Sequence, residues 1–169
     1  MTHVDLRTLR LRSGEEFSDF KEIELEPFEL GGQRYLPIPD RPVASYRITQ
    51  ASSGLVFELE LTARLFGPCM RCLSETSLSA DVEAREYQAS NADAAEELAT
   101  PYVRDAKLDL SAWARDAIAL ELPDKILCRA DCVGLCPVCG RDLNAEPHEH
   151  GEPEPDARWA KLEELKHRL

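Results

Sequence analysis

Six cysteines in two separated groups constrain the fold of this chain more than any other feature of its sequence. One group is a Cys-x2-Cys pair, and the other lies far downstream with the spacing Cys-x3-Cys-x3-Cys-x2-Cys: Cys69, Cys72, Cys128, Cys132, Cys136 and Cys139. In a Cys-x2-Cys turn the backbone doubles back, so both sulfurs can face one metal ion at about 2.3 Å. The spacing therefore predicts that metal ions, and zinc above all, hold parts of this fold together.

Two histidines add to the set of candidate ligands. His148 and His150 are separated by one residue, and in an extended segment such side chains project to the same side, where both imidazoles can reach one ion. The alternative is that these histidines merely lie in a solvated acidic loop. The candidate metal ligands are Cys69, Cys72, Cys128, Cys132, Cys136, Cys139, His148 and His150.

Two zinc sites of four ligands each would use all of these groups, in one of two pairings. The preferred pairing joins Cys69, Cys72, Cys128 and Cys132 at one ion, and Cys136, Cys139, His148 and His150 at the other. The alternative joins the two Cys-x2-Cys turns, as zinc ribbons do, and leaves Cys128, Cys132, His148 and His150 for the second ion. The spacing does not decide between them. In both, protein ligands fill every position around the metal, which predicts two structural zinc ions and no catalytic residue.

The expected cellular location bears on what the cysteines do. The N-terminal segment has no continuous apolar stretch and no small-residue cleavage site, and no apolar run reaches the roughly 18 residues of a membrane-spanning helix. We therefore expect a cytoplasmic protein with no membrane partner. In that reducing compartment cysteines are metal ligands or redox groups more often than disulfides. A redox pair is the weaker alternative, because a thioredoxin-like site needs a βαβ context that this sequence lacks.

Most of the first half of the chain is expected to form strands. Between residues 17 and 88, charged and apolar side chains alternate with a period of two, which is typical of antiparallel strands with one buried face. Ser52, Ser53 and Gly54 separate two such runs and predict a hairpin turn. Cys69 and Cys72 fall between two later runs, so they are expected in a connection at one end of the sheet.

Two helices are expected after the strands. Leu110–Leu122 places apolar residues on one side at helical spacing, and Pro123 ends it, so Trp113 is expected in the core. Ala89–Pro101, before this helix, is either an exposed loop or a short solvated helix. A last helix begins near Asp156, and its apolar stripe consists of Trp159, Leu162, Leu165 and Leu169.

Together these elements predict an α+β fold. We expect an antiparallel β-sheet or partly open barrel with a packing helix, and a zinc-bound C-terminal segment that ends in a helix. Residues 1–122 are predicted to be a β-rich core that includes helix 110–122. Residues 123–169 are predicted to be the zinc-binding segment, packed on that core.

Net charge restricts the partners of such a protein. With 20 basic and 32 acidic residues the chain carries −12, and six zinc-bound thiolates with two zinc ions would take this to about −14. Phosphate backbones repel such a chain unless its cations gather on one face. Arg71, Arg129 and Arg141 lie in or beside the cysteine turns and could form such a patch. The alternative is that each is an ordinary solvated arginine.

The motifs also resemble those of a known family. The segment CMRCL, a helix ending in ALELP, the cluster CRADCVGLCPVCGRDLN and the segment DARWAKLEEL are similar to the YceD family, the large ribosomal RNA subunit accumulation proteins. The resemblance covers roughly Val43–Leu169, and the C-terminal cysteine cluster is its most specific part. His148 and His150 stand where similar sequences have Cys-x-Cys, which keeps the ligand count and makes that site more sensitive to acid.

The resemblance implies a function. It points to a bacterial, non-enzymatic factor in ribosome biogenesis, which supports 23S rRNA accumulation or processing and large-subunit assembly. The implied partner is a large-subunit ribosomal precursor, contacted through its rRNA or through a basic ribosomal protein. The alternatives are a zinc-stabilised protein-binding adaptor unrelated to ribosomes and, less favoured, a thiol or zinc enzyme.

Overall fold

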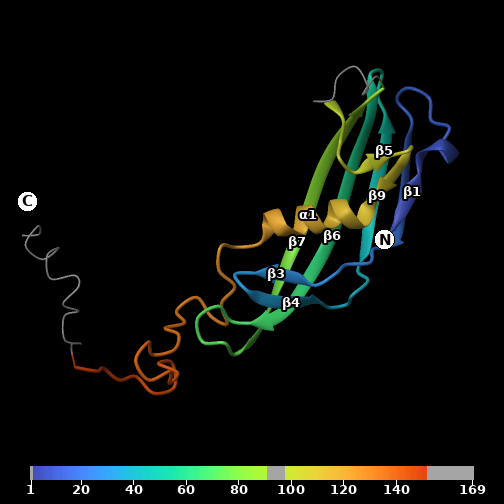
Figure 1. Ribbon diagram of the computed structural model, residues 1–169. Helices are drawn as coiled ribbons and strands as arrows, with labels where there is room; N and C mark the ends of the chain where they lie inside the picture. Colours follow the sequence, from blue (N-terminus) through green and yellow to red (C-terminus); the bar gives the residue numbers. More distant parts are fainter. Residues whose placement is uncertain (1, 91–97, 152–169) are drawn as a thin grey trace, which may run out of the picture. The chain divides into compact units, whose positions relative to one another are not determined.

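The chain divides into two compact units, Met1–Cys132 and Val133–Leu169. The computed structural model describes residues 2–90 and 98–151. In the first unit these residues form two antiparallel sheets and one α-helix (Figure 1), which confirms the predicted α+β class with antiparallel strands. Among the described residues both sheets are open, with no strand pairing that closes either into a barrel. The helix predicted from Asp156 lies outside the described residues, as does most of Ala89–Pro101, predicted to be either an exposed loop or a short helix.

The larger sheet is built around one long strand, β6. Along its whole length β6 pairs with β7, and on its other edge it pairs first with β5 and then with β4. The Ala51 N–H donates to the Gly54 carbonyl at 2.8 Å, which closes the predicted hairpin turn between β5 and β6. The strands are β2 (Glu16–Glu22), β3 (Phe28–Leu30), β4 (Gln33–Pro37), β5 (Val43–Gln50), β6 (Gly54–Pro68) and β7 (Glu75–Ala89).

One face of this sheet forms the core of the first unit. Alternate residues of β6 are buried, and helix α1 (Leu110–Glu121) crosses β6 and β7 on that side (Figure 1). The predicted helix is thus confirmed. Trp113 is 2% exposed, packs edge-on against Phe57 and stacks on Tyr102, as its predicted core position requires. Because truncating a buried Trp costs about 3–5 kcal/mol, this contact is a major source of the unit's stability.

The start of α1 is fixed by a capping residue. The Asp109 carboxylate accepts a hydrogen bond from the Ala112 N–H at 3.0 Å, which satisfies one of the free amides of the first turn. Pro123 follows the last residues of the helix and cannot continue it. These two signals were readable in the sequence.

A second, smaller sheet was not predicted. It consists of β1 (His3–Asp5), β9 (Lys107–Asp109) and β8 (Val103–Arg104), and a 3-10 helix, η1 (Leu6–Thr8), follows β1. Its strands are too short to show alternation. The β8–β9 turn places Asp105 and Ala106 at φ of 51° and 57°, a left-handed region where glycine or asparagine is usual. The sequence therefore gives no turn signal there.

The far end of the larger sheet carries the first cysteine pair. Cys69 and Cys72 lie in the connection from β6 to β7, as predicted. The segment after α1 returns to this connection, where the Met70 N–H donates to the Ile126 carbonyl at 2.9 Å. Ile126 is buried. This return brings residues after the helix beside the cysteine turn.

Candidate metal centres

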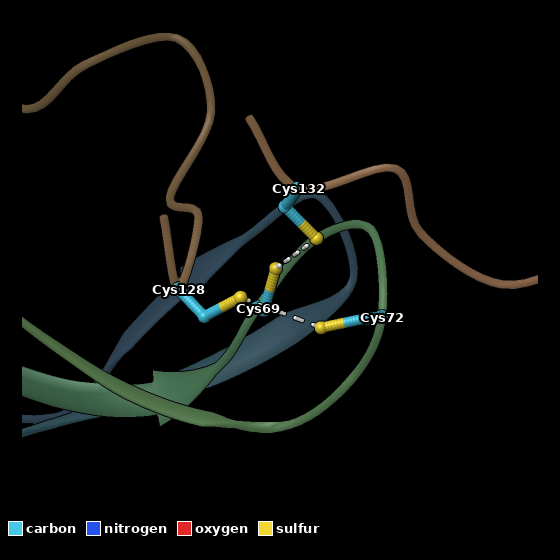
Figure 2. Close-up of side chains that lie close together, drawn as sticks. All are labelled: Cys69, Cys72, Cys128 and Cys132. Carbon is cyan, nitrogen blue, oxygen red and sulfur yellow. Dashed lines mark hydrogen bonds between the residues drawn. The ribbon is translucent and has the colours of Figure 1, made fainter. Parts of the chain in front are cut away.

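Four cysteines meet at the end of the larger sheet. Cys69 and Cys72 come from the β6–β7 connection, and Cys128 and Cys132 from the segment that follows α1 (Figure 2). The Cys69 and Cys132 sulfurs are 3.8 Å apart, and those of Cys72 and Cys128 are 3.6 Å apart. All but Cys128 are buried. We call these four residues the first cluster.

The turn that presents Cys69 and Cys72 has a defined hydrogen-bond pattern. The Cys69 N–H donates to the Ser74 carbonyl at 2.8 Å, and the Leu73 N–H donates to the Cys69 carbonyl at 3.0 Å. Leu73 has φ of 62°. A leucine in the left-handed region is strained by about 1–2 kcal/mol. The hydrogen bonds of the turn therefore hold Leu73 in a left-handed conformation that leucine disfavours.

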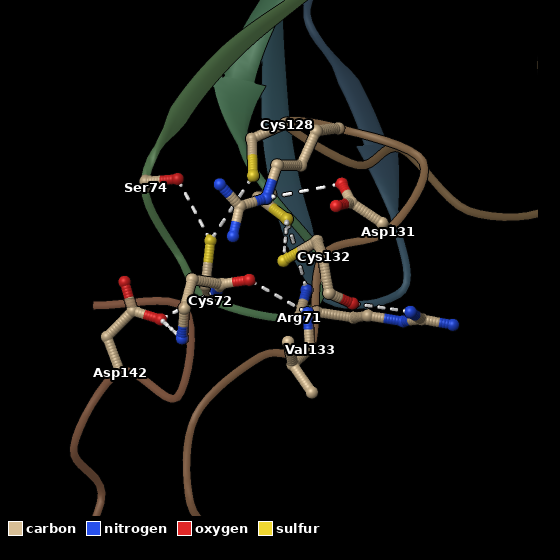
Figure 3. Close-up of polar contacts among 11 residues, drawn as sticks. Arg71, Cys72, Ser74, Cys128, Asp131, Cys132, Val133 and Asp142 are labelled. Atoms are coloured by element: carbon tan, nitrogen blue, oxygen red, sulfur yellow. Dashed lines mark hydrogen bonds and ion pairs between the residues drawn. The ribbon is translucent and has the colours of Figure 1, made fainter. Parts of the chain in front are cut away.

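Local donors stabilise the thiolate forms in this cluster. Burial raises the pKa of Cys69, but hydrogen bonds from the backbone of Cys72, Arg71 and Cys128 outweigh it and lower that pKa to about 6. The Ser74 hydroxyl lies 2.9 Å from the Cys72 sulfur (Figure 3) and is the main cause of the lowered pKa of that thiol. Thiolates are the form that binds metal.

Side chains around the first cluster hold its backbone in place. The Tyr35 hydroxyl donates to the Pro68 carbonyl at 2.8 Å, directly before Cys69, and Tyr35 is fully buried. Burial raises the pKa of Tyr35, with a smaller contribution from the Cys69 charge. The Arg71 guanidinium donates to the Cys132 carbonyl and so links the two segments (Figure 3).

The second cluster lies within the unit that begins at Val133. It comprises Cys136, Cys139, His148 and His150, whose ligand atoms all lie within 4.8 Å of one another. The Cys139 sulfur is 3.1 Å from Nε2 of His148. Cys136 is buried, whereas Cys139 and His150 are exposed.

The turn at Cys136 repeats the pattern of the turn at Cys69. The Cys136 N–H donates to the Arg141 carbonyl at 2.7 Å, and the Gly140 N–H donates to the Cys136 carbonyl at 2.8 Å. Gly140 has φ of 73°, the conformation that Leu73 adopts in the first turn. Backbone hydrogen bonds from Cys139 and Val138 lower the pKa of Cys136 to about 6. The two Cys-x2-Cys segments are therefore the same structural turn.

A carbonyl orients one of the histidines. Nδ1 of His148 lies 2.7 Å from the Glu146 carbonyl oxygen, which can only accept a hydrogen bond, so Nδ1 carries the proton. Nε2 of the neutral ring then directs a lone pair toward Cys139 and the cluster. Metal-binding histidines usually have such a partner on the second nitrogen. The same hydrogen bond is the main cause of the raised pKa of His148.

Both clusters fit a tetrahedral zinc ion. Sulfurs at about 2.3 Å from zinc are separated by about 3.8 Å along the edge of a tetrahedron, close to the separations in the first cluster. A disulfide would need about 2.05 Å, and all six cysteines are free thiols. Each group supplies four soft or borderline ligands, the set that zinc prefers.

The structure groups the eight candidate ligands as in the preferred pairing. The two Cys-x2-Cys turns do not share a cluster. Sequence reasoning missed Ser74 and the Glu146 carbonyl, which tune Cys72 and His148. A serine two residues after a ligand cysteine was a readable signal, whereas a backbone carbonyl carries none.

The three arginines near the cysteines are engaged by local partners. Arg71 donates to the Cys132 carbonyl. Arg129 lies 3.3 Å from a carboxylate oxygen of Asp131, and Arg141 lies 3.3 Å from one of Glu146. These contacts favour the interpretation of ordinary solvated arginines over that of a free basic patch.

Comparisons with known proteins place this chain in a family. Uncharacterized proteins of Mycobacterium bovis and Mycobacterium tuberculosis are each 40% identical to it over 124 residues, which is 70% of this chain. One of Mycobacterium leprae is 34% identical over 125 residues, also 70% of this chain and 56% of the relative. The chain spans 59% of the length of the first two relatives. No solved structure matches it.

Within the described residues, no helix is long and apolar enough to cross a membrane.

The model of one protein family, described as large ribosomal RNA subunit accumulation protein YceD, matches residues 57–166. This range includes both cysteine clusters and α1. Since it spans more than half of the sequence, the chain belongs to the YceD family of large ribosomal RNA subunit accumulation proteins.

Proposed function

We propose that this protein is a non-enzymatic factor in bacterial ribosome biogenesis, which supports 23S rRNA accumulation or processing and assembly of the large subunit in the cytoplasm. The family match over residues 57–166 is the observation that carries this proposal. The partner is a large-subunit precursor, contacted through its rRNA or through a basic ribosomal protein. The protein's role is to bind and to position, and its metal ions are structural.

Two zinc ions are part of the proposal, one in each cluster. The ligands would be Cys69, Cys72, Cys128 and Cys132 at one ion, and Cys136, Cys139, His148 and His150 at the other. With four protein ligands each, neither ion has an open position for a water or substrate, so zinc would supply cross-linking and no Lewis-acid chemistry. We propose that the C-terminal segment begins at residue 123, so the first ion would anchor the start of this segment to the sheet.

Burial of the thiols favours this role over a thiol enzyme. Cys69 and Cys132 are fully buried, so neither sulfur can meet a disulfide substrate. Metal analysis of protein purified under reducing conditions should give two zinc ions per chain and thiols that react slowly with alkylating reagents. Fewer than one zinc per chain, with one fast-reacting cysteine, would favour an enzyme.

The biological role is tested by depletion in the bacterium that makes the protein. We expect 23S rRNA precursors to accumulate, mature large subunits to decrease in sucrose gradients, and small subunits to remain at normal levels. Wild-type protein should restore the profile, and a Cys136→Ser variant expressed at the same level is the matched comparison. An unchanged large-subunit profile in depleted cells would overturn the proposal.

A further inference from the structure

Exposed apolar side chains gather on the face of the larger sheet opposite α1. Phe20 is 71% exposed, Val43 58%, Ile38 50% and Leu36 44%. We call these four residues the apolar strip. Isolated exposed apolar residues are common, but several that lie side by side are typical of an interaction surface.

Strand register places the strip along one edge of β6. Leu36 pairs with Phe66, and the Ile38 N–H donates to the Arg64 carbonyl at 2.8 Å. Further along the same edge, Ser45 pairs with Glu60. Val43 lies two residues before Ser45, so its side chain is on the same face of the sheet as that of Ser45. Phe20 pairs with Ser45 from the next strand, β2. The four side chains therefore follow one another on one surface.

An acidic pair adjoins the strip. Glu60 and Glu83 lie directly opposite each other on β6 and β7, in the row that also contains Phe20. Within the part of the chain that the structure describes, no basic side chain lies within ion-pair distance of either. Like charges in a directly opposed strand pair are unfavourable. This pair is thus a local cost that a partner's cation would relieve.

Two arginines on this face already have carboxylate partners. Arg47 lies between Glu16 and Glu58, at 4.0 Å and 3.4 Å, and Arg85 lies 3.8 Å from Glu58. The neighbouring Thr62 hydroxyl donates to Asp81 at 2.8 Å.

Arg34 and Arg64 lie on the same face beside Leu36 and Ile38, and among the described residues neither has a carboxylate within ion-pair distance; Arg64 donates to the Ser77 hydroxyl at 3.3 Å. The unpaired negative charge is that of Glu60 and Glu83, at the Phe20 end of the strip.

We infer that this face docks a basic polypeptide segment that carries apolar side chains among its lysines and arginines. This inference rests on the proposed function and names its partner as a basic ribosomal protein of the large subunit. Apolar side chains of the segment would cover the strip, and its cations would meet Glu60 and Glu83. RNA fits poorly at the Phe20 end of the strip because its phosphates would meet the carboxylates of Glu60 and Glu83.

A charge reversal separates docking from folding. Glu60→Lys places a cation opposite Glu83, so the strand pair becomes favourable and the melting temperature should stay the same or rise. Combined with Phe20→Thr and Val43→Thr, which keep a high strand propensity, it should reduce co-sedimentation with large-subunit precursors at least tenfold. The matched control is Leu120→Gln with Glu121→Lys, which changes an exposed leucine and glutamate on α1 and should leave co-sedimentation unchanged.

The outcomes distinguish this inference from the proposed function. If wild-type protein does not co-sediment with the precursors, the proposed function fails and the docking inference fails with it. If wild-type protein and the folded triple variant co-sediment equally, only the docking face is wrong.

Photo-crosslinking identifies the molecule that binds the apolar strip. It needs a change at only one exposed position of the chain. The variant Phe20→p-benzoyl-L-phenylalanine is irradiated in complex with large-subunit precursors, and the product is treated with nuclease. We expect a nuclease-resistant product that mass spectrometry identifies as a lysine- and arginine-rich large-subunit protein. A product that nuclease removes, crosslinking to a second copy of this chain, or the absence of any large-subunit product would overturn the inference.

Discussion

The two cysteine clusters share one type of turn but differ in what surrounds them. The first cluster is continuous with the core of its unit, and Cys69 and Cys132 are fully buried. The second cluster has an exposed Cys139 and His150, and within the described residues the apolar core ends at Ile126, before this unit begins. The same ligand turn can therefore reinforce an existing core in one place and replace a core in another.

Removal of the metal should unfold the second unit and leave the larger sheet of the first unit folded. This is the largest effect that we expect. With zinc bound as proposed, a strong chelator should abolish amide protection in residues 133–151, because a segment with so little apolar burial has nothing else to hold it. The larger sheet should keep its protection. Hydrogen exchange measured by mass spectrometry resolves the two units. Equal loss of protection in both would contradict the comparison.

Acid should release the metal of the second cluster before that of the first. The pKa of His148 is raised, chiefly by its hydrogen bond to the Glu146 carbonyl. Nε2 binds zinc only when it carries no proton, so protons compete with zinc for it as the pH falls, and ligation by His148 is lost on the acidic side of that raised pKa. Zinc release followed with a colorimetric chelator during an acid titration should show two steps. The His148→Cys variant is the control, and its two steps should merge.

Tyr35→Phe should affect the first cluster alone. The change removes the hydrogen bond to the Pro68 carbonyl and leaves the ring in place, so a loss of about 1 kcal/mol in unfolding free energy is expected. Thermal unfolding gives this loss, and chelator competition should show faster zinc release from one site only. Val138→Ala, an exposed position in the second turn, serves as a control with little expected effect. Release from both sites would refute the assignment.

Substitutions at the left-handed position of each turn should give the smallest changes in stability, and these changes should have opposite signs. Leu73→Gly relieves strain at φ of 62°, and half of the Leu73 side chain is exposed, so a gain of up to about 1 kcal/mol is expected. Gly140→Ala introduces strain at φ of 73° where nothing else lies within 4 Å of the new Cβ, so a similar loss is expected. Chemical denaturation monitors the first change, and zinc affinity monitors the second. The same sign for both would show that the turns are not equivalent.

Much of the fold was predictable because its signals are local. The alternation on β6, the capping of α1 and the spacing of each Cys-x2-Cys pair all depend on residues that are neighbours in the sequence. The grouping of the ligands matches the preferred pairing, but the spacing could not decide it, because the grouping depends on where the segment after α1 returns to the cysteine turn, at the buried Ile126. The left-handed conformation of Leu73 was also not predicted, because leucine disfavours it, and the hydrogen bonds of the turn hold it there.

The spacing of the first cluster has a consequence for the unfolded chain. Cys69 and Cys132 are 63 residues apart, and the span between them contains β7, β8, β9 and α1. A zinc ion that bridges them closes a long loop, and by the chain-entropy estimate for cross-links such a closure removes about 4 kcal/mol of unfolded-state entropy, against about 3 for the short loop at the second cluster. An unfolded molecule that keeps its first zinc would therefore start refolding with the two ends of that loop already joined.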